Sequence, residues 1–340
     1  MHTPIKGLLR TAAAALLLAG MSLAAHADPF RLIVTHLEPP LVPNSVMDLA
    51  VELGYFKREG VDVELVRVQQ TPSAIAAIQS GEGEMANIGL DALSQLVATG
   101  TTDLKAVVSP NKSLPYLIAS KDSITTTADL AGKSFGIGRP GSLDHSLSSR
   151  VLTADGVDLA KVDFVAIGQP DIRIQALAAG QIDATTVSIG VWQSLPDKTG
   201  LHILVSQDDY YAAAPVINKV NIVSQKALEE RHDDVVKVIT ALVKISRDFA
   251  KDPSKWVDAI APFQPNVSRA DLETLAASFA KSWSVNGGMS AKELQYSTDW
   301  LYQTEDFKDL KPVEMSSWAD LSLVGDVLKS LGTDASMDAP

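Results

Sequence analysis

The stretch that most constrains the fold runs from Met47 to Asp91, where apolar side chains alternate between helical and strand spacing. Residues 47–56 carry apolar side chains at helical spacing. Residues 61–66 place apolar and acidic side chains on opposite faces, as in a strand. Thr71 to Ser80 reads as a second helix, and residues 84–89 read as a short strand. Because helices alternate with strands, the sequence predicts a parallel sheet with helices on both faces, which binds ligands at the carboxyl ends of its strands.

Two segments of this stretch also resemble a known family. Residues 50–64 read A-x-x-x-G-Y-F-x-x-E-G-V-D-V-E, and residues 77–86 read A-I-Q-S-G-E-G-E-M-A. Together they are similar to the nitrate/sulfonate/taurine family of periplasmic substrate-binding proteins of ABC transporters. The resemblance covers residues 30–184 well, whereas the C-terminal third shares only the general helical character of the family. It implies the two-lobed α/β fold of a type II periplasmic binding protein, in which each lobe is a mixed, mainly parallel sheet flanked by helices.

The order of the predicted elements indicates how the chain divides between the lobes. Turn-rich residues 109–115 and 208–215 are predicted to cross between them, and 217–224 to return as a strand. We therefore expect a first lobe from 28–112 plus 219–340, with a helical C-terminal part, and a second lobe from 113–218. Two crossing strands would form a hinge, and the ligand would bind in the cleft between the lobes.

The N-terminus has the parts of a secretory signal. Lys6 and Arg10 precede an apolar run over residues 11–25, which is short for a membrane span, and Ala25-His26-Ala27 is a small-x-small cleavage site. We expect cleavage after Ala27 and a periplasmic mature chain; an uncleaved anchor helix is the alternative. The chain has no cysteine, which excludes disulfides and lipoprotein attachment. Its net charge of -12 argues against nucleic acid as a partner.

The strongest local candidate for ligand contact is the loop that leads into a predicted helix at residue 143. Free N–H groups and the positive end of the helix dipole can hold a carboxylate, a sulfonate or nitrate there. Gly141 and Ser142 match a ligand-contacting turn that the family resemblance implies. Ser142 could donate to the ligand or only cap the helix. Asp144 and His145 lie in the first turn, and a capping role is favoured for Asp144 because its charge would repel an anion.

The other candidates are side chains at the ends of predicted strands or at the starts of the helices that follow. They are His36, Glu38, Gln70, Thr71, Ser73, Leu90, Asp91, Tyr116, Gln169, Asp171, Ser188 and Trp192.

Several of these candidates have a plainer alternative. His36 could donate to an anion or be a satisfied side chain at a strand end. Asp91 could cap a helix or contact a ligand amine. Tyr116 and Trp192 could wall the pocket or belong to the core. Arg139 and Arg173 are the basic residues nearest the cleft, but Arg173 sits one turn into a helix, where an exposed ion pair is expected.

These features favour a non-enzymatic receptor that captures a small organic anion by hinge closure, without a cofactor or metal. The hydroxyls of Thr71, Ser73 and Ser142 suit a sulfonate, a taurine-like ligand or a carboxylate. The resemblance implies an inner-membrane ABC permease as the partner of a monomeric protein, although a periplasmic sensor domain could take that place. The alternative is a thiamine-pyrimidine precursor binding protein or a related pyrimidine synthase-like enzyme; such enzymes typically carry a cysteine-rich motif, which this chain lacks.

Overall fold

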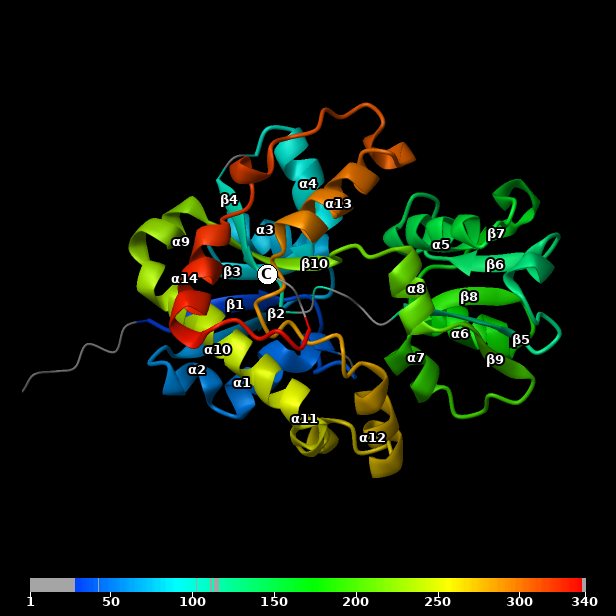
Figure 1. The fold of residues 1–340 in the computed structure, drawn as a ribbon, viewed down its shortest axis with the longest axis horizontal. Coiled ribbons are helices and arrows are strands. Elements are labelled where there is room, and N and C mark those ends of the chain that lie inside the picture. The colour runs from blue at the N-terminus through cyan, green and yellow to red at the C-terminus, as the bar shows by residue number, and fades with distance from the viewer. Residues whose placement is uncertain (1–27, 42, 102, 111, 113–115, 338–340) are drawn as a thin grey trace, which may run out of the picture.

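The computed structural model describes residues 28–41, 43–101, 103–110, 112 and 116–337, and it shows two lobes of unequal size (Figure 1). Each lobe is built on a five-stranded mixed sheet. The strand order is β2-β1-β3-β10-β4 in the first lobe and β7-β6-β8-β5-β9 in the second. This architecture confirms the predicted two-lobed α/β fold. The predicted signal segment, residues 1–27, lies outside the described residues.

The strands are short, and their bounds in chain order are as follows. They are β1 Phe30–Val34, β2 Val63–Arg67, β3 Met85–Gly89, β4 Leu104–Val108, β5 Tyr116–Lys121, β6 Ser134–Ile137, β7 Asp163–Ala166, β8 Ala184–Ser188, β9 Leu201–Val205 and β10 Lys219–Ser224.

The helices between the strands flank the two sheets. In the N-terminal part and the second lobe they are α1 Val46–Glu52, α2 Tyr55–Arg58, α3 Thr71–Gln79, α4 Leu90–Ala98, α5 Leu143–Ala154, α6 Pro170–Ala178, α7 Ile189–Ser194 and α8 Gln207–Ala213. The C-terminal third adds α9 Gln225–Glu230, α10 His232–Lys251, α11 Pro253–Ile260, α12 Arg269–Ser278, α13 Ala291–Leu301 and α14 Leu321–Leu331.

One strand in each sheet runs against its neighbours. In the first lobe, β1 pairs in parallel with β2 and β3, whereas β10 lies antiparallel between β3 and β4. In the second lobe, β5 lies antiparallel between β8 and β9. The amino ends of β5 and β10 therefore lie at the same sheet edge as the carboxyl ends of their neighbours. Residues at the start of these two strands are brought to the edge that binds ligands in open α/β sheets.

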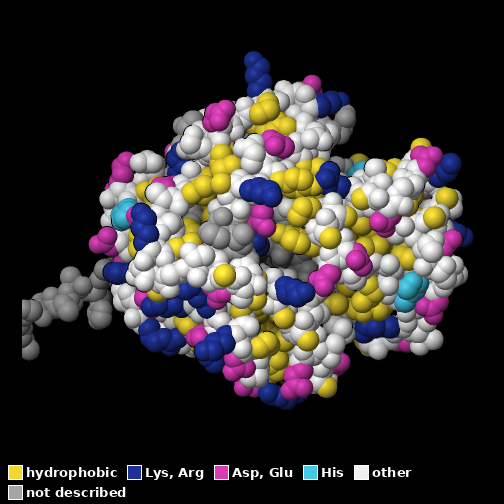
Figure 2. All heavy atoms as spheres, in the orientation of Figure 1, with side chains coloured by type: hydrophobic (Ala, Val, Ile, Leu, Met, Phe, Trp, Pro, Cys, Tyr) yellow, Lys and Arg dark blue, Asp and Glu magenta, His cyan; other side chains and the backbone are white. Residues whose placement is uncertain are grey.

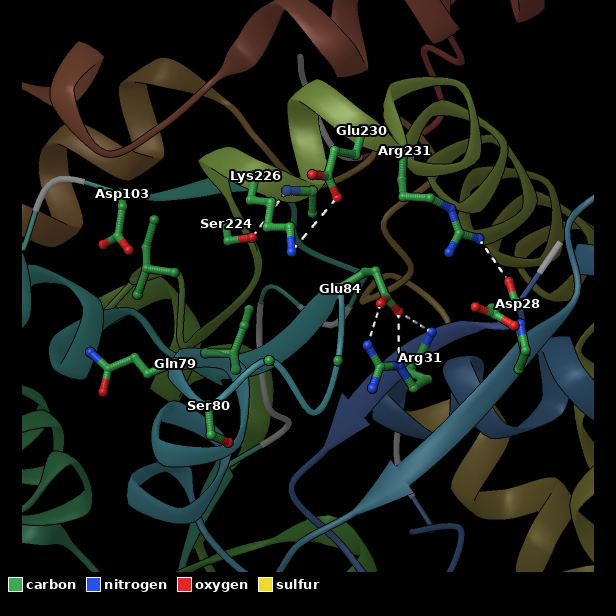
Figure 3. A pocket seen from close by; sticks show the side chains of 16 residues that line it. Asp28, Arg31, Gln79, Ser80, Glu84, Asp103, Ser224, Lys226, Glu230 and Arg231 are labelled. Carbon is green, nitrogen blue, oxygen red and sulfur yellow. Dashed lines mark hydrogen bonds and ion pairs between the residues drawn. The ribbon is translucent and has the colours of Figure 1, made fainter.

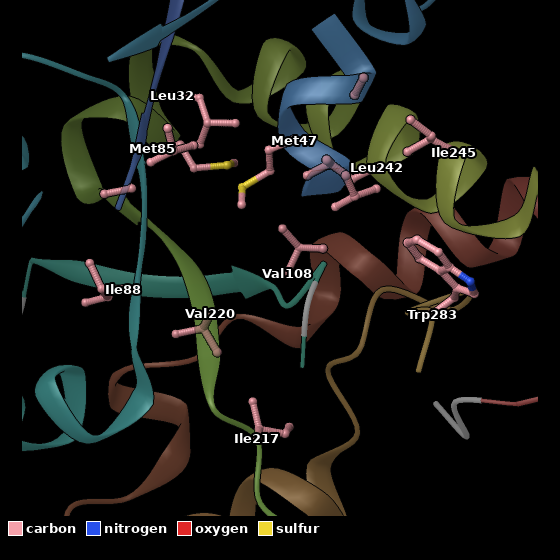
Figure 4. Packing of buried hydrophobic residues seen from close by; sticks show 14 of the residues in the cluster. Leu32, Met47, Met85, Ile88, Val108, Ile217, Val220, Leu242, Ile245 and Trp283 are labelled. Atoms are coloured by element: carbon pink, nitrogen blue, oxygen red, sulfur yellow. The ribbon is translucent and has the colours of Figure 1, made fainter. Parts of the chain in front are cut away.

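The core of the first lobe joins its sheet to the long helix α10. Figure 4 shows Leu32, Met47 and Leu242 reaching the same apolar layer from β1, α1 and α10. Further along, Phe249 of α10 packs on Trp283 at a ring-centroid distance of 5.2 Å. Because α10 buries one face from Val235 to Phe249, it anchors the helical C-terminal third on the first sheet.

The second crossing is shorter than the sequence predicts. Residues 207–213 form α8, which packs against β5 and α5 in the second lobe, so the prediction of a crossing over 208–215 is wrong there. Ser206 accepts a hydrogen bond from the Asp209 N–H and caps this helix. The chain returns through 214–218, beside the first crossing, since the Asn218 N–H donates to the Lys112 carbonyl over 2.7 Å.

The C-terminal segment, residues 291–307, touches both lobes. Helix α13 contacts α4 of the first lobe. At its end, however, Trp300 and Leu301 pack in the second lobe's apolar cluster, together with Phe307 and the strand residues Ile118 and Phe135. A movement of the lobes relative to each other must therefore displace or bend this segment.

Candidate functional site

Charged side chains from both lobes meet at the facing sheet edges. Asp91, in the first turn of α4, interacts electrostatically with Lys219 of its own lobe and with Arg139 of the other lobe. In the second lobe, burial raises the pKa of the Tyr116 phenol, and the charges of Asp144 and Asp91 raise it further. The two lobes therefore act on each other with charged groups of both signs. Figure 2 shows hydrophobic side chains gathered around the middle of the visible face, with charged groups among them.

Lys219 is the cation of the first-lobe edge. Its Nζ donates to Thr35 Oγ1 over 2.6 Å, so the side chain reaches from β10 past β3 to the end of β1. Its partner in the β3 register is Gly89. Burial lowers the pKa of Lys219 to about 8, although the Asp91 carboxylate acts in the opposite direction.

Asp91 shares this edge. Burial raises the pKa of its carboxyl group, while hydrogen bonds from the N–H groups of Ala92 and Asp91 lower it. The carboxyl group accepts from N–H groups in the first turn of α4, but the N-cap residue is Gly89 and no side chain caps this helix, so Asp91 is not the cap that the alternative predicted. A side chain at Gly89 would place its Cβ 2.2 Å from Asp91 Oδ1, so the glycine makes room for the carboxylate.

In the second lobe, Asp144 and Arg173 organise the loop before α5. Asp144 Oδ2 accepts from the Gly138 N–H at 2.8 Å and lies 3.5 Å from the Arg173 guanidinium. Arg173 also donates to the carbonyls of Gly168 and Thr186. Its exposed fraction is 3%, so the predicted exposed ion pair is wrong: α6 packs on β8, and this turns Arg173 inward.

The loop residues Gly141 and Ser142 bond mainly within their own turn. Ser142 Oγ donates to the Arg139 carbonyl at 2.7 Å and makes no side-chain cap on α5, although Ser142 is its N-cap residue. Gly141 has a φ of 74°, and its N–H donates to His145 Nδ1 at 3.1 Å. Burial lowers the pKa of His145. A Cβ at Gly141 would lie 2.6 Å from the Asp306 carboxylate, so the C-terminal segment closes over this turn.

Among the described residues, only one of the predicted ligand loop after β2, Thr71, is tied to the charged edge by a hydrogen bond. Thr71 Oγ1 accepts from the Gly89 N–H at 3.3 Å and ties the start of α3 to the end of β3. Gln70, Ser73 and Glu38 are exposed.

His36, at the end of β1, is held by a carboxylate. Its Nε2 lies 2.7 Å from Asp48 Oδ2, and Arg67 lies 2.7 Å from the other oxygen of Asp48. His36 Nδ1 is buried and has no hydrogen-bond partner in the part of the chain that the structure describes. The histidine is therefore oriented by a carboxylate, with one ring nitrogen unused.

The remaining predicted residues divide between surface, cap and core. Gln169 and Asp171 are exposed at the start of α6. Ser188 caps α7 by accepting from the Val191 N–H at 3.3 Å. Leu90 and Trp192 are buried in the core, so the core alternative holds for Trp192.

Two residues of this edge, Asn218 and Lys219, were not predicted. They lie at the start of the return strand, which the sequence does predict over 217–224. The direction of β10 places them at the ligand-binding edge, and recognising that the strand is antiparallel would have identified them.

A wide polar hollow of about 840 Å³ lies at the opposite edge of the first sheet. Figure 3 shows Arg31 paired with Glu84 and Arg231 bonded to the Asp28 carbonyl across it. These cations already have partners, and the hollow is lined by residues at the amino ends of β1, β3 and β4. Asp28, the predicted first residue of the mature chain, is among them. The charged groups that interact between the lobes are the better candidate site.

Two searches of the described residues bear on other site classes. No group of three His, Asp or Glu side chains there is placed to hold a metal ion. Within the same residues, no helix has the length and apolar character to cross a membrane.

Solved structures with the same fold include binding proteins and an enzyme. A ligand-binding component of an ABC-type import system from Staphylococcus aureus is 17% identical, with a TM-score of 0.70 over 88% of this chain and 99% of that one. The alkanesulfonate-binding protein SsuA from Xanthomonas axonopodis pv. citri, bound to MOPS, is 19% identical, with a TM-score of 0.65 over 87% and 100%. The desulfurization enzyme DSZB is 18% identical, with a TM-score of 0.66 over 89% and 99%. At these identities the similarity establishes the fold.

Sequence comparison supplies the family. No curated protein sequence matches the chain. A family model described as NMT1/THI5 like matches residues 46–255, which is more than half of the chain. The match spans the segments that carry the resemblance to periplasmic substrate-binding proteins, and that resemblance is confirmed. The chain is a member of the NMT1/THI5-like family.

Proposed function

We propose that the protein is the periplasmic solute-binding component of an ABC importer. It binds a small organic anion between its lobes and delivers it to an inner-membrane permease. The observation that carries this proposal is that Lys219 and Arg139, from opposite lobes, both act electrostatically on Asp91. An anion placed there interacts with both cations only when the lobes are close together, so it favours the closed arrangement.

Sulfonates and taurine-like compounds are the preferred ligands, ahead of carboxylates. The similar fold of SsuA, an alkanesulfonate-binding protein, supports this order. An ammonium and a guanidinium suit the oxygens of a sulfonate or carboxylate. In a taurine-like ligand, the amine would have Asp91 as its carboxylate partner.

A second candidate function is enzymatic or pyrimidine-directed. The His36–Asp48 pair favours it, because a histidine oriented by a carboxylate is one part of a general base; its other nitrogen is buried, so a substrate must first open this site. The fold similarity to DSZB, which is named as an enzyme, is compatible with this possibility. Turnover that is lost in His36→Gln would establish this second function.

The test is a thermal-shift screen of residues 28–340 after unfolding and refolding to remove carried-over ligand. The panel contains ethanesulfonate, taurine, nitrate, acetate, benzoate and uracil. A ligand at a hundred times its Kd stabilises a protein by about 2.7 kcal/mol, which raises Tm by several degrees. We expect ethanesulfonate or taurine to give the largest shift, and Lys219→Met to reduce it. A panel without any shift would contradict the receptor function.

A further inference from the structure

A small cavity lies where the two crossings meet. Its walls come from the start of β5, from α5 and α8, and from the return crossing. The lining residues are Tyr116, Leu147, Tyr210, Tyr211, Ala214, Val216 and Asn218. Its volume of about 10 Å³ is close to the space needed by one water molecule or one oxygen atom.

Asn218 supplies a buried amide to this cavity. Its exposed fraction is 5%, and its Nδ2 has no acceptor at full hydrogen-bond distance among the residues that the structure describes. The side chain lies beside the Tyr116 phenol: burial raises the pKa of this phenol, and a hydrogen-bonding interaction with Asn218 lowers it. Because buried polar groups in folded proteins normally have partners, an unpaired amide here needs a reason.

Both backbone groups of Asn218, the N–H and the carbonyl, are hydrogen-bonded, in contrast to the side-chain amide. Its N–H donates to the Lys112 carbonyl at 2.7 Å, and its carbonyl accepts from the Leu90 N–H at 2.9 Å. These bonds hold the crossing in place without the amide. The hydroxyl of Tyr210, another wall residue, lies 3.2 Å from Ser148 Oγ, within hydrogen-bond distance. The Tyr210 hydroxyl therefore has a hydrogen-bond partner, whereas Asn218 Nδ2 has none at full hydrogen-bond distance in the described part of the chain.

We propose that the Asn218 amide and the Tyr116 hydroxyl together bind one acceptor oxygen of the ligand. Tyr116 begins β5 and Asn218 directly precedes β10, so both lie at the ligand-binding edges of their sheets. A cavity of about one oxygen atom beside an amide N–H and a phenol O–H suits an acceptor oxygen. The ligand end that enters the cavity is a carboxylate, a sulfonate or a ring carbonyl. This inference rests on the proposed function and adds the residues that recognise the ligand's oxygen.

The experiment compares Asn218→Leu and Asn218→Asp with the wild-type chain, residues 28–340. Ligand-free Tm is measured first. Leucine has a similar size and no polar atom, so we expect Tm to stay unchanged or rise, because an unpaired buried amide is removed. A fall of several degrees would show that the amide is structural and would overturn the inference, even if none of the probes binds the wild type.

Binding is then measured by calorimetry with ethanesulfonate, acetate and uracil. We expect Asn218→Leu to weaken the probe that binds wild type by tenfold or more. For an anionic probe, Asn218→Asp should weaken binding further, because the new carboxylate repels the ligand. For uracil, the two variants should lose similar affinity. Unchanged affinity in both variants would overturn the inference and leave the receptor function standing, whereas a wild type that binds no probe would contradict that function.

Discussion

The pKa of Lys219 leads to a quantitative prediction about anion binding. Burial lowers the pKa of this lysine to about 8, against the opposing effect of Asp91. The ammonium is then present in about 90% of molecules at pH 7 and in about 10% at pH 9. If the anion binds only the ammonium form, its affinity is complete below the folded pKa and is lost as the pH rises through it. Between pH 7 and pH 9 the Kd for ethanesulfonate should therefore rise about tenfold.

The assay is calorimetry at pH 7, 8 and 9 at one ionic strength, because screening also weakens ion pairs. Ethanesulfonate is the probe since it stays ionised throughout. Lys219→Arg keeps its charge at pH 9, so its affinity should change little over this range. Lys219→Met should bind weakly at every pH. A wild-type Kd that is independent of pH, or an equal decline in Lys219→Met, would refute the assignment of Lys219 to the anion.

Three further predictions concern stability. Arg173→Met should lower the free energy of unfolding by about 3–5 kcal/mol in urea titration, since it removes a buried guanidinium and leaves the partly buried Asp144 without its cation; a loss under about 1 kcal/mol would contradict the pairing. Trp300→Ala should cost about 3–5 kcal/mol, because this side chain is 7% exposed in the second lobe's cluster; a near-neutral effect would mean that the C-terminal segment does not dock there. Burial raises the pKa of Asp183, but hydrogen bonds from Lys121 and from the Ser134 N–H and hydroxyl outweigh this and lower it to about 2. Wild type should thus exceed Asp183→Asn in Tm above about pH 4 and lose that advantage as the pH falls toward 2; a constant difference across this range would argue against the linkage.

The C-terminal segment bears on how the lobes could close. Its start contacts the first lobe, and Trp300 and Phe307 are buried in the second. Asp306 also lies 3.8 Å from Arg139 beside the Gly141 turn. Closure around a ligand therefore involves this segment as well as the two crossings, and the ligand loop of the second lobe moves in contact with it.

Local patterns in the sequence determined the elements. The apolar alternation over 61–66 became β2, and the run over 84–89 became β3. The helical C-terminal part predicted for the first lobe contains α10, His232–Lys251. Such patterns report on nearest neighbours along the chain, and the periods of 3.6 and 2 residues are visible without any tertiary contact. The alternation of these elements also predicts an α/β sheet, and the family resemblance implies the two lobes.

The tertiary structure alone decided which polar residues meet. Arg173 follows the pattern of an exposed helix position, yet the packing of α6 on β8 buries it beside Asp144. Asn218 and Lys219 lie where a strand was predicted, but periodicity does not report the direction of a strand in its sheet. Because β10 runs antiparallel to β3, its first residue, Lys219, lies beside Gly89 at the carboxyl edge of the sheet.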